Sequence, residues 1–127
     1  MVKYFSPEFF NQLQDSLAGD AKWQESTRGL KTSIRLSTTD PNASASYLLK
    51  VEEGRTTIAQ TDLGSQAEFS FEGAYETWTK VAKGEVDLQS AVLKGLLKFK
   101  GSITKILFYK DRFLRIAEVM RSIPVEF

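Results

Sequence analysis

Residues 84–101 read GEVDLQSAVLKGLLKFKG, and this segment is the most informative about the architecture of the chain. Asp87 can cap a short helix, and Gly95 can end it because glycine adopts the left-handed conformation at little cost. A leucine and a phenylalanine then alternate with lysines, which predicts a short strand. Ser102 follows as the cap of another helix. The segment therefore predicts the order helix, strand, helix.

Downstream of this segment, one long amphipathic helix is predicted to continue until Pro124 stops it. Its apolar side chains recur at helical spacing, and they are Ile103, Ile106, Leu107, Phe113, Leu114, Ala117 and Met120.

Upstream, a helix ends at Gly84 and shares one apolar face among Tyr75, Trp78, Val81 and Ala82. Four segments before it alternate between apolar and polar residues with a period of two, which predicts strands at 30–37, 45–52, 56–61 and 67–72. We expect these strands to form a meander with one face exposed to solvent.

The chain begins with a predicted helix, in which Ser6 is the cap, Pro7 opens the first turn and Gly19 ends the helix. Residues 20–29 are polar apart from Trp23, and we expect a turn or a partial helix there. The whole pattern predicts a single α+β domain over residues 1–127. Its sheet should have five strands, be mainly antiparallel and be covered by helices on one face.

The 127 residues contain neither cysteine nor histidine, which excludes disulfides, thiolate metal sites and histidine-based acid–base catalysis. The acidic pairs Glu52–Glu53 and Glu68–Glu72 are assigned to a turn and to the exposed side of a strand, so neither pair suits a catalytic cleft. No glycine-rich phosphate loop occurs. We therefore expect no enzyme activity, no cofactor, no metal site and no nucleic-acid binding.

Charge is unevenly distributed, because residues 94–121 hold eight basic and two acidic side chains while the net charge of the chain is only +1. Solvated faces of ordinary helices and strands are the first interpretation. The alternative is a weak contact with an anionic membrane, in which Lys105, Arg112 and Arg115 would share one face of the last helix. The N-terminus lacks the apolar core of a signal peptide and no apolar run reaches membrane-span length, so we expect a cytoplasmic protein.

Residues 67–101 resemble the signature half of the sterol carrier protein 2 family, above all in the pattern Gly-x-Leu-Lys-Phe-x-Gly at 95–101. The order of the remaining elements is similar over nearly the whole chain. Two features depart from the family. The helix over 102–122 is longer than the minimal domain requires, which leaves the shape of a tunnel exit open, and no peroxisomal Ser-Lys-Leu ending is present.

The resemblance implies an apolar tunnel between sheet and helices that binds fatty acids, acyl-CoA, sterol-like or phospholipid-like molecules, with lipid transfer as an open extension. The alternative is a protein-interaction or regulatory accessory module without a dedicated ligand, and a homodimer is left open. The resemblance implies these lining residues: Trp78, Val81, Leu88, Val92, Leu93, Leu97, Phe99, Ile103, Ile106 and Leu107, with Phe9, Phe10 and Leu13 as weaker candidates.

Overall fold

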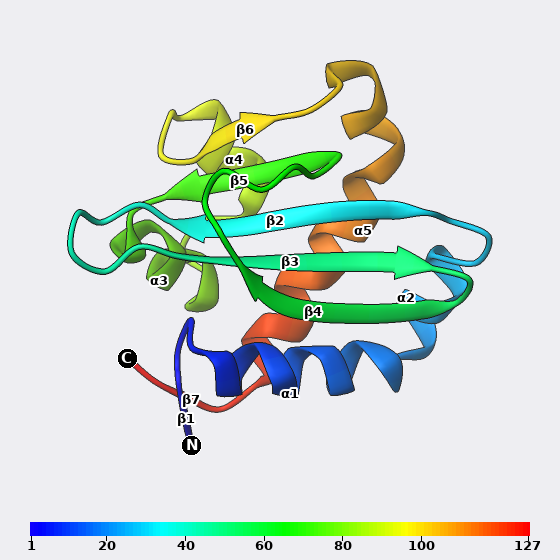
Figure 1. Ribbon diagram of the computed structural model, residues 1–127, viewed down its shortest axis with the longest axis horizontal. Helices are drawn as coiled ribbons and strands as arrows, with labels where there is room; N and C mark the ends of the chain where they lie inside the picture. Colours follow the sequence, from blue (N-terminus) through cyan, green and yellow to red (C-terminus); the bar gives the residue numbers. More distant parts are fainter.

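The computed structural model describes residues 1–127, in which a mixed sheet packs against helices (Figure 1). In chain order the elements are β1 (Val2–Lys3), α1 (Pro7–Ala18), α2 (Ala21–Ser26), β2 (Thr32–Thr38), β3 (Ala45–Glu52), β4 (Arg55–Thr61), β5 (Phe69–Gly73), α3 (Tyr75–Ala82), α4 (Leu88–Leu93), β6 (Lys98–Lys100), α5 (Ile103–Ser122) and β7 (Val125–Glu126). The predicted fold class, α+β with five strands in the main sheet, is confirmed.

Local signals in the sequence identify the helix ends correctly. The Ser6 side chain accepts a hydrogen bond from the backbone N–H of Phe9 at the start of α1, and Ser102 does the same for Lys105 at the start of α5. Asp87 caps α4 by accepting from the N–H of Ser90. The partial helix expected after residue 20 is α2, whose Trp23 is buried. These caps act over three or four residues, which is why sequence alone reveals them.

The strand order is β4-β3-β2-β5-β6, which corrects the expected meander (Figure 1). β2, β3 and β4 form successive antiparallel hairpins as expected. β5, however, pairs with β2 in parallel, so residues 62–68 carry the chain from one edge of the hairpins back across the sheet. A period of two shows which face each residue occupies but not which strand lies beside it.

Helices cover the inner face of the sheet, as predicted, and the core lies between them. Figure 1 shows α5 running behind the sheet and α1 lying along its β4 edge. The buried residues of the sheet, of α1 and of α5 belong to one continuous apolar cluster. From the sheet these include Ile34, Leu36, Leu49, Phe69 and Phe71; from α1, Phe9, Phe10, Leu13 and Leu17; from α5, Phe113, Ile116 and Met120.

The outer face of β2 and β5 is not fully solvated, which corrects a second expectation. Arg35 is only 5% exposed. Its guanidinium lies 2.7 Å from the Glu72 carboxylate and donates to the backbone carbonyl of Ser65 in the crossing segment, residues 62–68. The crossing segment therefore helps to cover polar side chains that the alternation assigned to solvent.

The two ends of the chain meet in a small parallel pair that the sequence analysis missed. β1 and β7 pair Val2 with Val125, and the Tyr4 hydroxyl donates to the carbonyl of Trp78 at 2.7 Å. Two-residue strands are too short to show a period, so no pattern could have predicted them.

Candidate functional site

A cavity of about 660 Å³ opens between α4, the β5–β6 edge of the sheet and the first half of α5. Eleven of its fifteen lining residues are hydrophobic. Its deep part consists of buried side chains, among them Phe71, Leu88, Leu97 and Phe113. Leu93, Ile103 and Leu107 also line it but are largely exposed, so they form the mouth.

The floor of the cavity results from the pairing of β5 with β6, in which Phe71 lies opposite Phe99. The two rings are 5.2 Å apart, centroid to centroid. Gly101 permits the end of β6 to pack closely on the start of β5, because a Cβ at that position would lie 2.7 Å from the Phe69 ring and 3.0 Å from the Glu68 carbonyl oxygen. The wall from α5 is one helical stripe of side chains three or four residues apart, namely Ile103, Ile106, Leu107, Lys110, Phe113 and Leu114.

Eight of the ten residues that the resemblance implied lie together around this cavity: Leu88, Val92, Leu93, Leu97, Phe99, Ile103, Ile106 and Leu107. Trp78 and Val81 do not line it. Both are fully buried, and the Trp78 indole donates to the carbonyl of Ser37 at 2.9 Å while its ring packs on Phe5. The apolar face of α3 is therefore used for the core.

The weaker candidates Phe9, Phe10 and Leu13 are also core residues and lie outside the cavity. Seven further residues line the cavity that were not predicted from the sequence: Phe71, Gln89, Lys100, Gly101, Lys110, Phe113 and Leu114. Extending the stripe of the last helix by helical spacing would have found the three on α5. The expected tunnel stays a prediction.

The polar side chains in the lining are Gln89, Lys100 and Lys110, and the lining contains no acidic residue. The Lys100 ammonium is 4.0 Å from the Glu72 carboxylate on the outer side of β5. Lys110 is the lysine of the lining that forms no ion pair, and the cavity thus combines an apolar interior with one free cation, an arrangement suited to an amphiphile that has an apolar body and an anionic end.

Each of the three cations that the membrane alternative placed on one face of the last helix has a protein partner, and the contact with a membrane stays a prediction. The Lys105 ammonium is 2.8 Å from the Glu68 carboxylate, and the Arg112 guanidinium donates to the backbone carbonyl of Ser26 at 2.8 Å. Burial raises the pKa of Glu68, but hydrogen bonds from Lys105 and Thr32 outweigh burial and lower it overall. Glu68 is therefore held as a carboxylate that neutralises Lys105.

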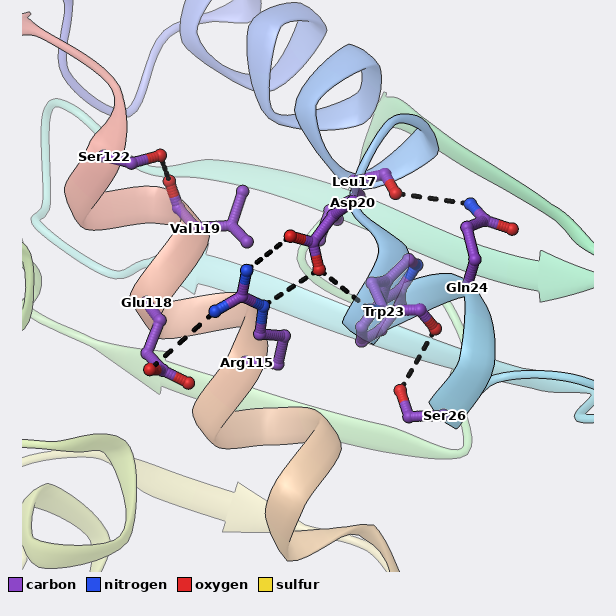
Figure 2. A network of polar contacts seen from close by, with 9 residues as sticks. All are labelled: Leu17, Asp20, Trp23, Gln24, Ser26, Arg115, Glu118, Val119 and Ser122. Carbon is purple, nitrogen blue, oxygen red and sulfur yellow. Dashed lines mark hydrogen bonds and ion pairs between the residues drawn. The ribbon is translucent and has the colours of Figure 1, made fainter.

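Arg115 is the third of these cations, and Figure 2 shows it turned toward the start of α2. Its Nε donates to Asp20 Oδ2 at 2.9 Å, and a second guanidinium nitrogen donates to the other carboxylate oxygen. The same carboxylate accepts from the N–H of Trp23. The Arg115 hydrogen bond is the main reason that the pKa of Asp20 lies below its ordinary value. Helical spacing alone could not reveal these partners.

The structure contains no group of three or more histidine, cysteine or carboxylate residues that could hold a metal ion. None of its helices combines the length and apolar character needed to cross a membrane.

Comparison with solved structures supports the fold. The chain superposes on a crystal structure of sterol carrier protein 2 with a TM-score of 0.85 and 21% identity, covering 96% of this chain and 100% of the other. A conserved hypothetical protein of Thermus thermophilus, described as a candidate sterol carrier protein, gives a TM-score of 0.84 at 20% identity, covering 99% and 93% of the two chains.

The same fold occurs within a larger enzyme, the stereoselective inverting sec-alkylsulfatase Pisa1 of Pseudomonas sp.. That likeness has a TM-score of 0.60 at 19% identity and covers 97% of this chain but 17% of the sulfatase. A search of curated proteins finds no match. The model of the SCP-2 sterol transfer family matches residues 10–112, and the chain therefore belongs to that family.

Proposed function

We propose that this protein binds an elongated lipid in the cavity between α4, β6 and α5. The observation that carries the proposal is the lining, in which buried apolar side chains form the deep part and exposed apolar side chains form the mouth. Family membership and fold support lipid binding or transfer in general. The volume of about 660 Å³ also suits a single lipid, since small-molecule pockets span roughly 300–1,000 Å³.

Burial of apolar surface supplies the affinity. Each methylene removed from water contributes about 0.8 kcal/mol, so about ten buried methylenes contribute on the order of 8 kcal/mol before the cost of immobilising the chain. No catalytic group is needed for this role, and the lining offers no carboxylate, histidine or cysteine.

The head group should be anionic. Lys110 lies in the lining without an acidic partner, whereas the Lys100 ammonium is directed toward Glu72 on the outer side of β5. A carboxylate or phosphate at the mouth would gain charge-assisted hydrogen bonds that the hydroxyl of a sterol cannot match. We therefore expect a fatty acid or an acidic phospholipid to bind more tightly than a sterol of similar apolar area.

The test is a titration with cis-parinaric acid, a fluorescent long-chain fatty acid, followed by displacement with oleate or cholesterol. Val92 lines the cavity and Val125 does not, yet both are half-buried valines. Val92→Trp should fill the cavity and weaken binding at least about tenfold, whereas Val125→Trp should retain the wild-type affinity. Equal binding by both folded variants would place the ligand elsewhere.

The accessory-module alternative predicts a different result. A protein of that kind would show no saturable binding of cis-parinaric acid, and native mass spectrometry would show no bound lipid after gentle purification. The occurrence of the fold within a sulfatase is the observation that favours this alternative.

A further inference from the structure

A polar cavity of about 520 Å³ adjoins the apolar cavity and differs from it in chemistry. Two of its nine lining residues are hydrophobic, whereas eleven of fifteen are hydrophobic in the apolar cavity. The charged residues among the nine are Glu85, Asp87, Lys94, Glu118 and Arg121. The apolar cavity therefore suits a hydrocarbon chain, and the polar cavity suits groups that form hydrogen bonds or carry charge.

Both cavities lie between α4 and one side of α5. Along α5, the lining of the apolar cavity extends from Ile103 to Leu114, and the lining of the polar cavity extends from Leu114 to Arg121. The residues of α4 and its two caps also divide between them, with Leu88, Gln89, Val92 and Leu93 on the apolar cavity and Asp87, Ser90 and Lys94 on the polar one. The short helix α4 thus presents one face to each cavity.

Leu114 is the one residue that lines both cavities. It is half-buried in α5. Phe113 and Leu114 end the apolar lining along this helix, and Glu118 begins the charged lining one turn later. The Leu114 side chain is therefore placed as a partition between a hydrophobic and a charged environment.

We propose that Leu114 is a specificity-determining residue, because it closes the apolar cavity toward the polar one. The apolar cavity then accepts a lipid tail that ends in a methyl group and excludes a tail that ends in a polar group. A hydroxyl at the tail end would be buried among hydrocarbon side chains, where it loses its hydrogen bonds to water and gains no partner. The inference rests on the proposed lipid binding and specifies the class of lipid as one with a single polar end.

Charge favours one orientation of the bound lipid. Lys110, the lysine of the apolar lining without an acidic partner, precedes Leu114 by one turn and lies nearer the mouth. Beyond Leu114, the polar cavity is lined by three carboxylates and two cations, so it does not favour an anionic head group. The head group therefore stays at the mouth and the tail points toward Leu114.

The experiment is displacement of cis-parinaric acid by palmitate and by ω-hydroxypalmitate, which differ by one terminal hydroxyl. Leu114→Ala should join the two cavities. The matched control is Ile106→Ala, because Ile106 is also a half-buried residue of α5 but lines the apolar cavity alone. The control removes a similar apolar volume without opening a path to the polar cavity.

Wild-type protein should bind palmitate about tenfold more tightly than ω-hydroxypalmitate, and Ile106→Ala should keep this ratio. Leu114→Ala should lower the ratio to about twofold, because the terminal hydroxyl can then reach the polar groups beyond position 114. Leu114→Val removes less volume and should give an intermediate ratio, which keeps the test available if the alanine variant does not fold.

Two results would overturn the inference while leaving the proposed lipid binding intact. One is equal affinity of the wild type for the two fatty acids. The other is a ratio that is the same in the wild type and in the folded Leu114 variants. A wild-type protein that binds neither fatty acid would instead overturn the proposed function, and the inference with it.

Discussion

Gly95 and Gly101 lie on either side of β6, and each position requires glycine for a different reason. Gly95 has a φ of 74° after α4, with no other atom within 4 Å of where a Cβ would be. Gly101 has a φ of 147°, and its Cβ would in addition collide with Phe69, Glu68 and Phe99. The first position has only a conformational requirement, while the second also has a steric one.

We predict that Gly95→Ala lowers the free energy of unfolding by about 1 kcal/mol, the cost of a left-handed alanine. Gly101→Ala should cost more, because the floor of the cavity must shift to admit the methyl group. Urea denaturation of both variants measures the difference. Equal losses of unfolding free energy in the two variants would show that β5 and β6 can move apart at little cost, so the close contact at Gly101 would not require glycine.

Among the helices, α2 and α5 are joined through Asp20, which serves both (Figure 2). Its carboxylate caps α2 at the N–H of Trp23 and accepts two hydrogen bonds from Arg115 of α5. The two roles can be separated, because asparagine is a good helix cap but carries no charge.

Asp20→Asn should therefore cost less than about 1 kcal/mol of unfolding free energy, whereas Asp20→Ala should cost about 1 kcal/mol more through loss of the cap. Thermal unfolding in dilute buffer compares the two variants. If asparagine and alanine are equally destabilising, the cap contributes nothing and the link to Arg115 accounts for the whole effect.

The stabilisation that the Asp20–Arg115 ion pair gives to the fold depends on pH, and the direction of this dependence can be predicted. Because the pKa of Asp20 is lower in the folded protein than in the unfolded chain, the link stabilises the fold above the ordinary aspartate pKa of about 3.9. This contribution is lost as the pH falls from there through the folded pKa. The difference in stability between the wild type and Arg115→Gln should accordingly shrink below about pH 4, and a difference that is constant with pH would contradict this origin.

Across the molecule as a whole, the crossing segment determines the strand order and Arg35 holds that segment in place. Arg35 and Glu72 come from the neighbouring parallel strands β2 and β5, and their side chains are 6% and 12% exposed. The hydrogen bond from Arg35 to the Ser65 carbonyl ties the crossing segment to this pair. Arg35 Nε is buried and has no hydrogen-bond partner, so the guanidinium depends on Glu72 and the Ser65 carbonyl for its polar contacts.

We predict that Glu72→Leu alone lowers the free energy of unfolding by about 3 kcal/mol, because it leaves the buried Arg35 guanidinium without a counter-charge. Arg35→Met should cost less, because the Lys100 ammonium remains 4.0 Å from Glu72. The double variant should be more stable than the sum of the two losses implies, since no charge remains buried. Chemical denaturation of all four proteins completes the double-mutant cycle. Additive losses would mean that the two groups act independently.

Features that depend on neighbours within a few residues were predictable from the sequence. Ser6, Asp87 and Ser102 cap helices where their side chains can reach a backbone N–H three residues ahead. Alternation identified the strands, and the spacing of Gly95 and Gly101 predicted a short strand between two helices. Resemblance over the same segment then identified eight residues that line one cavity.

The meeting of distant segments, by contrast, follows from tertiary packing. The parallel pairing of β5 with β2 buried Arg35 and Glu72, although their positions in the alternation suggested solvent. Burial in the core removed Trp78 from the cavity, and ion pairs with Glu68 and Asp20 occupied Lys105 and Arg115. Each of these outcomes depends on a partner more than thirty residues away in the chain. Helical and strand periods specify the face on which a side chain lies, whereas packing alone selects what lies against that face.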